Sequence, residues 1–305
     1  MNRFLKNLGL FILPVFLLCA SAEFALRSIP NDYSYKSNYL DRNSENIEVL
    51  FLGSSHAYRD INPIFINLNG FNAGYVSQTL DYDLKILEKY DGNWGHLKYI
   101  VLPISYFSLF YQLRTSTESW RVKNYNIYYG MTSSNKLTDY FEILSNNLEI
   151  NLERITSYYV LGKPNITSSQ LGWGASFNSG SQPDLLESGV SAATRHTYAD
   201  DKYFNDNLTI LRSIIYFADK RHITVFLYTP PAYHSYVEHL DKAQLERTLM
   251  AIKQIDHDYR NVFYVNFLTD DSFTAVDFLD ADHLNEIGAE KFTKKIGELI
   301  YKNSQ

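Results

Sequence analysis

The sequence predicts an α/β fold with a parallel five-stranded sheet, on the basis of three observations. Short apolar runs alternate along the chain with segments of helical spacing, and this alternation implies parallel strands joined by crossover connections. The first run, IEVLFLG at 47 to 53, is almost wholly apolar, as expected of a strand buried on both faces. A chain of 305 residues with 45% hydrophobic content can also fill a sizeable core.

The other strands and helices follow from the same alternation. Pro230 and Pro231 end the fourth strand, because proline cannot donate to a strand ladder. The predicted strands lie at 47 to 53, 70 to 73, 97 to 105, 223 to 231 and 261 to 268. The predicted helices lie at 78 to 90, 208 to 222, 242 to 259 and 284 to 302.

Residues 106 to 205 interrupt this rhythm. They contain a helical pattern at 140 to 161 and a Gly/Ser-rich tract at 171 to 184 that predicts a loop. Because the strand pattern resumes afterwards, we interpret 106 to 205 as an insertion between the third and fourth strands. The predicted organisation is a leader at 1 to 27, a polar linker at 28 to 46, and one domain at 47 to 305 that carries the insertion.

The N-terminal residues predict a membrane-inserted helix. Arg3 and Lys6 precede an uncharged stretch at 7 to 22, a pattern that keeps the N-terminus in the cytoplasm and sends the rest across the inner membrane. The residues Ala20-Ser21-Ala22 fit a cleavage site, but helix-forming residues continue after them, so a retained signal-anchor fits as well. We expect either a membrane-anchored periplasmic domain or a protein secreted after cleavage near Ala22.

Composition and charge exclude several classes of function. The net charge of −6, without a basic run, offers no electrostatic surface for nucleic acid. The first loop has a single glycine and lacks GxGxxG and the phosphate-loop lysine, which argues against a nucleotide- or flavin-binding protein. The single cysteine, Cys19, excludes an intrachain disulfide, and no HxxxH-like spacing indicates a metal site. We expect no cofactor and no metal.

Candidate catalytic residues lie after the first and last predicted strands. Ser55 stands at the carboxyl end of the first strand, where the loops of a parallel sheet converge. A serine is a nucleophile only when a base takes its proton, and His283, before the last helix, is the best candidate for this base. Asp280, three residues earlier, can hold the other imidazole nitrogen. The alternative is that Asp282 or Asn285 simply caps the last helix.

These segments resemble the SGNH hydrolase superfamily, also called GDSL-like lipases and acylhydrolases. The first block of that family appears as Gly53-Ser54-Ser55, its last block as DADH at 280 to 283, and the glycine of its second block as Gly74. The resemblance covers roughly 47 to 105 and 208 to 300. It implies a three-layer α/β/α fold of flavodoxin-like type, with Ser55 as nucleophile, His283 as base and Asp280 as the residue that orients the base.

The resemblance also implies an oxyanion hole formed by the backbone N–H groups of Ser55 and Gly74. The third block of the family normally carries an asparagine that donates to the oxyanion, whereas this chain has VLPISYFSL there. Ser105 is the nearest polar side chain and is the expected substitute. His56 is too close in sequence to act as the base, so we expect it to order the loop or to contact substrate, and Ser54 is expected to serve the hydrogen bonds of the turn.

Four further residues are candidates for binding substrate. Tyr233 and Tyr236 follow the fourth strand, where they either stack on a sugar ring or pack a loop. Arg195 can hold a carboxylate or phosphate, or it forms a surface ion pair, and His196 is its neighbour.

Two functions follow from these features. The first is a serine-dependent acyl-ester hydrolase or O-acyltransferase that acts on a cell-surface glycan or exopolysaccharide, with acetyl as the expected group and a polysaccharide-biosynthesis protein of the membrane as a possible partner. The second is a non-catalytic protein of the same fold that binds glycan or supports an envelope assembly. The absent asparagine and the long aromatic insertion favour the second function.

Overall fold

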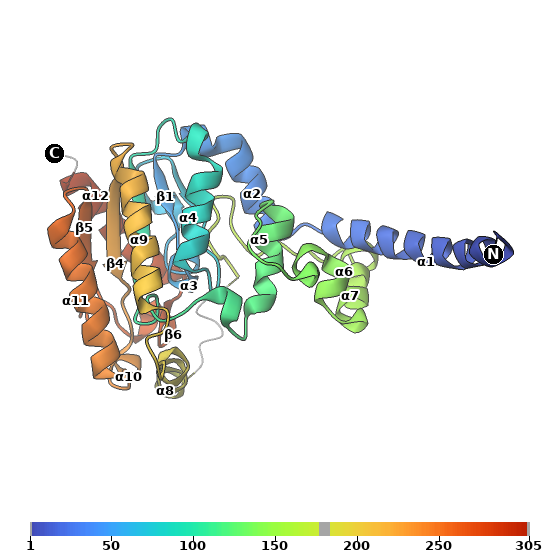
Figure 1. Cartoon of the computed structure of the whole chain (residues 1–305). Coiled ribbons are helices and arrows are strands. Elements are labelled where there is room, and N and C mark those ends of the chain that lie inside the picture. Colours follow the sequence, from blue (N-terminus) through green and yellow to red (C-terminus); the bar gives the residue numbers. More distant parts are fainter. Residues whose placement is uncertain (1, 177–183, 304–305) are drawn as a thin grey trace. The chain divides into compact units, whose positions relative to one another are not determined.

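The computed structural model describes residues 2 to 176 and 184 to 303 of the chain (Figure 1). The chain forms two compact units. The helical unit comprises Met1–Asn38 and Thr117–Thr167, and the sheet unit comprises Tyr39–Ser116 and Ser168–Gln305. The predicted insertion at 106 to 205 is therefore divided, because its central part clusters with the N-terminal residues and its two ends belong to the sheet unit.

The sheet unit contains a parallel sheet of five strands in the order β2-β1-β3-β4-β5, which confirms the predicted fold class. This is the flavodoxin-like order, in which β2 lies on one side of β1 and the later strands lie on the other side. The loops that follow β1 and β3 therefore diverge and leave a crevice at the carboxyl ends of those strands. The strands are β1 (Val49–Phe51), β2 (Gly70–Asn72), β3 (Tyr99–Pro103), β4 (Thr224–Thr229) and β5 (Val262–Asn266).

Helices cover both faces of this sheet. Phe51, Val101 and Phe226 are paired across the central strands and share one buried cluster with Phe292 and Ile296 of α12 (Glu286–Lys302). Because successive strand residues point to opposite faces, the neighbouring strand positions face the other way. There α4 (Leu80–Lys89) and α9 (Phe204–Asp219) lie side by side in front of the sheet (Figure 1). These helices and the sheet form the three layers.

Local sequence signals account for the starts of the later helices. Asp241 accepts the N–H of Gln244 and begins α11 (Lys242–Asp258), which packs on β5. Asn285 accepts two backbone N–H groups and begins α12. The capping alternative is thus correct for Asn285, whereas Asp282 lies in a turn before the helix. Short helices complete the unit: α3 (Ser55–Tyr58), α8 (Leu185–His196) and α10 (His234–Val237).

The helical unit contains α1 (Asn2–Ser28), α5 (Val122–Tyr128), α6 (Glu142–Ser145) and α7 (Leu148–Ile155), which continues into a π-helical turn at Thr156–Val160. Its centre is a buried ion-pair cluster. The carboxylate of Glu142 lies 2.6 Å from Lys123 Nζ and 2.7 Å from Arg154 Nη1, and Tyr128 donates to it at 2.6 Å. Burial opposes the charge of Glu142, but these partners outweigh it and lower the pKa of Glu142 to about 2.

Residues 28 to 46, predicted as a polar linker, are helical for most of their length. Helix α2 spans Asp32–Asn43, with its beginning in the helical unit and its end in the sheet unit. Lys36 and Leu40 are fully buried on one side of it. Apart from Leu40, the side chains buried on this helix are those of Tyr33, Lys36 and Ser37, which carry little hydrophobic signal, so the sequence pattern did not indicate a helix. Residues 177 to 183 of the predicted Gly/Ser-rich loop lie outside the described residues.

Helix α1 has the length and composition of a membrane span. Its segment Arg3–Ser28 has a mean hydropathy of 2.1, and none of its most apolar window is buried within the protein. A signal sequence near an N-terminus has the same properties, so both predicted forms of the leader fit this helix.

Candidate active site

Ser55 is positioned by the sharp turn that ends β1. Gly53 has φ +113°, and a Cβ there would lie 2.6 Å from the ring of Pro103, so only glycine fits this turn. The buried carboxylate of Asp83 accepts the Gly53 N–H at 2.8 Å and holds the strand end. Ser55 then begins α3 at the carboxyl end of the strand, where the sequence predicted it.

A two-residue hairpin brings Asp280 to His283. Strands β6 (Phe278–Asp280) and β7 (His283–Leu284) are antiparallel, and Asp280 pairs directly with His283. The connecting turn is held from three sides, because Tyr233 N–H and Ser188 Oγ bond the backbone of Ala281, and the buried Asp60 accepts the Leu284 N–H at 2.9 Å. The spacing of three residues therefore results from a hairpin.

The structure places the side chains of Ser55, His283 and Asp280 in one hydrogen-bonded line. His283 Nε2 lies 2.8 Å from Ser55 Oγ, and His283 Nδ1 lies 2.8 Å from Asp280 Oδ1. Because Asp280 accepts a hydrogen bond from Nδ1–H, the hydrogen of the neutral ring stays on Nδ1 and Nε2 is free to accept the proton of the serine. The arrangement is that of a nucleophile, a base and an orienting carboxylate.

The charges around His283 favour its protonated form. Burial opposes the positive charge, but the carboxylates of Asp280 and Asp282 outweigh it and raise the pKa of His283. Burial also opposes the charge of Asp280, yet His283 and then Arg59 lower its pKa below the usual range. Arg59 Nη1 lies 3.6 Å from Asp280 Oδ2. An imidazolium formed when Ser55 loses its proton is therefore stabilised.

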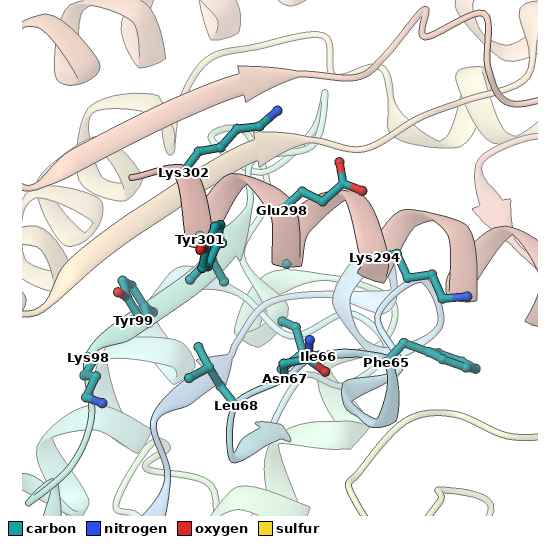
Figure 2. A pocket seen from close by; sticks show the side chains of 12 residues that line it. Phe65, Ile66, Asn67, Leu68, Lys98, Tyr99, Lys294, Glu298, Tyr301 and Lys302 are labelled. Carbon is teal, nitrogen blue, oxygen red and sulfur yellow. The ribbon is translucent and has the colours of Figure 1, made fainter. Parts of the chain in front are cut away.

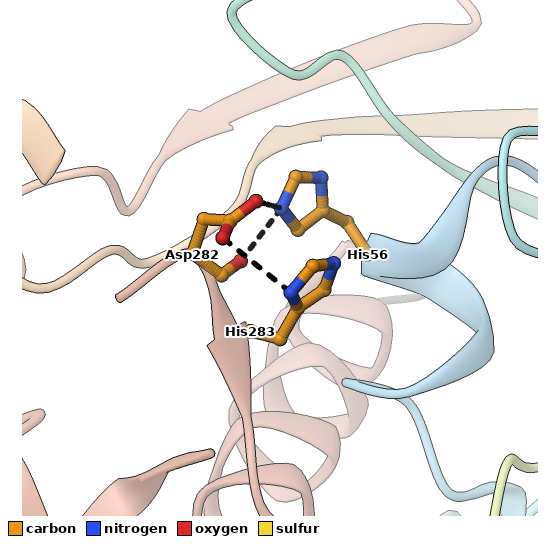
Figure 3. Close-up of side chains that lie close together, drawn as sticks. All are labelled: His56, Asp282 and His283. Carbon is orange, nitrogen blue, oxygen red and sulfur yellow. Dashed lines mark hydrogen bonds and ion pairs between the residues drawn. The ribbon is translucent and has the colours of Figure 1, made fainter. Parts of the chain in front are cut away.

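His56 lies beside the ring of His283 and binds the turn that precedes it. Its Nε2 lies 2.6 Å from the backbone oxygen of Asp282, and its ring is 4.9 Å from the ring of His283, centroid to centroid (Figure 3). It is only 2% exposed. The loop-ordering expectation for His56 fits this geometry, whereas a substrate contact does not, since both ring nitrogens bind the protein.

Ser105 binds His56, which corrects its predicted place in the oxyanion hole. Because a carbonyl oxygen only accepts, His56 Nε2 carries the hydrogen bonded to Asp282. Burial keeps the pKa of His56 well below its ordinary value, so the ring is neutral and Nδ1 accepts. Ser105 Oγ, 2.7 Å away, then donates its hydrogen to Nδ1 and has none left for an oxyanion.

The backbone N–H of Gly74, the other predicted oxyanion donor, also has a hydrogen-bond partner already. Its N–H donates to Asn72 Oδ1 at 3.0 Å, and the amide group of Asn72 donates to the backbone oxygens of Ala57 and Ile61 at 2.7 Å. The predicted oxyanion role of Gly74 therefore does not fit this arrangement. Ser55 N–H, at the start of α3, bonds to no residue that the structure describes, and it is the predicted donor that the geometry leaves available.

Asp282 is a buried carboxylate with one unsatisfied oxygen. Its Oδ1 lies 3.5 Å from His283 Nδ1, while its Oδ2 has no hydrogen-bond partner among the described residues and lies 3.8 Å from His56 Nε2 and 3.7 Å from His196 Nδ1. Burial is the main cause that raises the pKa of Asp282 to about 6.

The group His56, Asp282 and His283 is close enough to hold a cation (Figure 3). However, the imidazole nitrogens that face Asp282 already bind the Asp282 backbone oxygen and Asp280. A cation would have to displace those protons and release the base from its orienting carboxylate. The hydrogen-bonded arrangement therefore fits proton transfer better than metal binding.

The structure does not gather the predicted substrate residues in an open cleft. Tyr236 is 3% exposed and its hydroxyl lies 3.0 Å from His196 Nδ1. Burial, followed by the charge of Arg195, lowers the pKa of His196 to about 3. Tyr233 packs its ring on Phe278, so the loop-packing alternative fits both tyrosines. Arg195 is exposed at the end of α8 and makes no ion pair with any described residue.

Access to the triad is narrow among the described residues. Ser55 is 9% exposed and His283 is 7% exposed. A cavity of about 750 Å³ lies at the opposite, amino end of the strands, between the residues before β3 and the end of α12 (Figure 2). It contains none of the predicted catalytic side chains. A cavity beside Ser54 measures only about 10 Å³, and the hydroxyl of Ser54 has no partner among the described residues, which corrects its expected role in the turn.

Sequence reasoning missed two buried carboxylates that support the site. Asp83 holds the end of β1, and Asp60 holds the start of β7. Asp83 lies within a predicted helix and Asp60 between the first two predicted strands, and acidic residues at such positions normally face solvent. The role of Asp282 was likewise reduced to a possible helix cap.

Comparisons with known proteins give fold likenesses only. No family model and no curated protein matches the chain. It is similar to a solved structure described as a candidate acylhydrolase from Bacteroides fragilis, with 13% identity and TM-score 0.44, covering 90% of this chain and 100% of that one. It is also similar to a GDSL-like lipase from Bacteroides thetaiotaomicron, with 12% identity and TM-score 0.41, covering 90% and 100%.

A third similar structure, from Streptococcus pneumoniae, is described as a candidate platelet activating factor, with 13% identity and TM-score 0.45, covering 96% of this chain and 99% of that one. All three TM-scores are below 0.5 and all three identities are 13% or lower.

Proposed function

We propose that this protein is a serine-dependent acyl-ester enzyme, a hydrolase or an O-acyltransferase of SGNH type. The observation that carries the proposal is the line of two 2.8 Å contacts from Ser55 Oγ through the imidazole of His283 to Asp280. Such a line lets a weakly acidic hydroxyl attack a carbonyl at neutral pH.

In the first half-reaction, Ser55 Oγ attacks the acyl carbonyl carbon while His283 Nε2 takes the serine proton. The carbonyl oxygen becomes an oxyanion, and the N–H of Ser55 lies at the right end of α3 to donate to it. When the intermediate collapses, the ester C–O bond breaks and His283 returns its proton to the leaving alcohol oxygen. The acyl group is then an ester of Ser55.

In the second half-reaction, an acceptor hydroxyl approaches the acyl carbonyl. His283 takes the proton of this hydroxyl, the oxygen attacks the acyl carbon, and the proton returns to Ser55 Oγ as the acyl group leaves. Water as acceptor gives hydrolysis, and a sugar hydroxyl gives O-acyl transfer. Because the protein groups are the same in both cases, only the acceptor differs.

The proposed substrate is an acetylated or acetyl-accepting glycan outside the cytoplasm. A small acyl group is supported by the low exposure of Ser55. A site beyond the inner membrane is supported by α1 and by Arg3 and Lys6 before its uncharged stretch. A membrane protein of polysaccharide biosynthesis is the proposed supplier of the acyl group.

One observation favours a second candidate, a non-catalytic glycan-binding or envelope-assembly protein. Gly74 N–H and the Ser105 hydroxyl are both spent on internal hydrogen bonds. Losing one oxyanion donor costs roughly 100- to 1000-fold in rate. The enzyme proposal therefore predicts slow hydrolysis of activated esters and requires that substrate binding supply the missing donor.

The test uses a fluorescent fluorophosphonate on the full chain in detergent. Wild type should be labelled, and mass spectrometry should find the phosphonate on the peptide that contains Ser55. Ser55→Ala should abolish the label, whereas Ser54→Ala should keep it, since the hydroxyl of Ser54 has no partner among the described residues. Equal labelling of wild type and Ser55→Ala would rule out the assigned nucleophile.

Acetyl release from p-nitrophenyl acetate and from acetylated oligosaccharides then separates the two reactions. If added unacetylated oligosaccharide gains acetyl groups while acetate release falls, the protein is a transferase. Failure of wild type to react with fluorophosphonate or with either ester would leave the binding protein as the better description.

A further inference from the structure

The helical unit carries exposed apolar side chains beside its membrane-span helix. Within the 18 residues from 144 to 161, six large apolar side chains are each more than half exposed: Leu144 51%, Leu148 74%, Leu152 54%, Tyr159 51%, Val160 73% and Leu161 57%. We call this set the apolar platform. Leu148 and Leu152 are one helical turn apart and therefore share a face of α7. Contiguous exposed apolar surface of this kind marks a contact with another apolar phase.

The platform is fixed to the carboxyl end of α1. Glu23 of α1 accepts the N–H groups of Glu142 and Ile143 at 3.1 and 2.9 Å, which caps α6. Arg27 donates to the backbone oxygen of Tyr140 at 2.6 Å. Tyr159 donates to the backbone oxygen of Ala25 at 2.9 Å. Helices α6 and α7 thus lie against the last turns of α1 (Figure 1).

These contacts define the depth of the platform along α1. The 27 residues of α1 extend about 40 Å at 1.5 Å per residue, longer than a hydrocarbon core of about 30 Å. The uncharged stretch ends at Ala22, and Glu23 is the first charge on the far side from Arg3 and Lys6. If α1 crosses the bilayer, the hydrogen bonds of Glu23 and Ala25 hold the platform at the outer boundary between hydrocarbon and headgroups.

We propose that the apolar platform is an interfacial membrane contact, which lies on the outer leaflet beside α1 with its leucine and valine side chains among the lipid acyl chains. Its composition fits that layer, since Tyr159 is amphipathic and the exposed Lys163 follows the platform at a level suited to phosphate headgroups. The buried cluster of Glu142, Lys123 and Arg154 keeps α5, α6 and α7 together behind this surface.

A lipid surface is a better occupant than a protein because of this continuity. The most apolar window of α1 is wholly unburied, and α6 and α7, which carry Leu144, Leu148 and Leu152 of the platform, contact α1, so two exposed apolar surfaces adjoin. A partner protein would need to match both a long helix and a short pair of helices. A bilayer matches both at once without any specific shape.

The test measures the depth of single labels on the full chain in vesicles. Cys19→Ser removes the native cysteine, and Leu148→Cys, Val160→Cys, Phe16→Cys and Met250→Cys each introduce one site for the environment-sensitive dye NBD. Phe16 reports on α1, and Met250, 70% exposed on α11 of the sheet unit, is the matched control for Leu148. The vesicles contain phosphatidylcholine and phosphatidylglycerol, with or without lipid that carries a shallow doxyl quencher.

The labels at Leu148 and Val160 should lose emission to the shallow doxyl lipid, while the label at Met250 should lose none beyond background. Equal insensitivity at Leu148, Val160 and Met250 would overturn the proposal, whatever the label at Phe16 reports. A blue-shifted but unquenched label at Leu148 and Val160 would overturn it in favour of a protein partner or a second copy. Because the substituted side chains are exposed, normal circular dichroism of each variant suffices to show that it is folded.

Discussion

Glu142 of the helical unit and Asp282 of the sheet unit are equally buried carboxylates in opposite surroundings. Their side chains are 1% and 2% exposed. Glu142 receives hydrogen bonds from Lys123, Arg154 and Tyr128, and its pKa is lowered to about 2. Asp282 has no cation within hydrogen-bond distance and one oxygen without a partner among the described residues, and its pKa is raised to about 6.

The difference distinguishes a carboxylate that stabilises the fold, that of Glu142, from a carboxylate that lies beside the proposed base, that of Asp282. A carboxylate whose lone pairs all accept hydrogen bonds stabilises one arrangement of helices, and this structural role is sufficient to explain it. A carboxylate left partly unsatisfied beside a titrating histidine costs stability, and groups of this kind concentrate at functional sites. Asp280, which is hydrogen-bonded to that histidine, lies between these two cases.

The largest effect is expected at Asp280. Asp280→Asn should lower kcat by roughly 10⁴-fold, because an amide favours the wrong tautomer of His283. Steady-state hydrolysis of p-nitrophenyl acetate measures the loss. A loss of less than 10-fold would mean that Asp282 Oδ1, 3.5 Å from the same nitrogen, orients the base in its place.

Glu142→Gln should destabilise the protein by about 3 to 5 kcal/mol, because it leaves the buried Lys123 and the partly buried Arg154 without their anion. Urea denaturation in one detergent measures this change in the free energy of unfolding. Glu149→Gln, at an exposed position of α7, is the control and should change little. Since the pKa of Glu142 is lowered on folding, the stability from this cluster is present above pH 4.5 and is lost as the pH falls towards 2.

Asp282→Asn should have the opposite sign and stabilise the protein at neutral pH by on the order of 1 to 3 kcal/mol. Because folding raises the pKa of Asp282 from 3.8 to about 6, its ionisation opposes folding as the pH rises through that interval. The gain should therefore be full above pH 6 and absent below pH 3.8. Urea denaturation at both ends of the interval tests it, with the exposed Asp271→Asn as control. Destabilisation at pH 7.5 would show that the carboxylate has a structural role like that of Glu142.

The smallest effect is a displaced pH profile. The carboxylates of Asp280 and Asp282 outweigh burial and raise the pKa of His283, so its neutral, base form becomes populated at a higher pH than that of an ordinary histidine. Activity should therefore rise with pH through that raised value. Asp282→Asn removes one negative charge and should move the acid limb of kcat/KM to lower pH. An unchanged limb would mean that His283 does not sense Asp282.

The sequence predicted the five strands and four of the long helices, and it singled out Ser55, Asp280 and His283, whose side chains lie together, because each depends on a local pattern. The apolar run before Gly53 marks β1, and the three-residue spacing of Asp280 and His283 is compact enough to be read directly. Parallel topology then places the loops that follow β1 and β5 at the same carboxyl edge of the sheet, which is why Ser55 and His283 could be paired from the sequence.

The sequence could not predict which polar groups pair across distant segments. The hydroxyl of Ser105 donates to His56 Nδ1, 49 positions away in the chain, through a contact visible only in the folded chain. The separation of residues 117 to 167 from the rest of the insertion was equally hidden, because the buried face of that unit contains charged side chains that read as surface. The spacing of apolar residues indicates which positions are buried only where the buried side chains are themselves apolar.

The hairpin that joins Asp280 to His283 also limits what evolution must preserve. Asp280 and His283 lie on the same short hairpin. A single distance, from that hairpin to Ser55 at the end of β1, therefore decides whether the three side chains meet. The segments of the chain between β1 and this hairpin can lengthen, shorten or be replaced as long as the sheet keeps that distance unchanged. A fold with only this one long-range distance to maintain can gain additional segments, or accept different acceptor molecules, without changes to the three side chains.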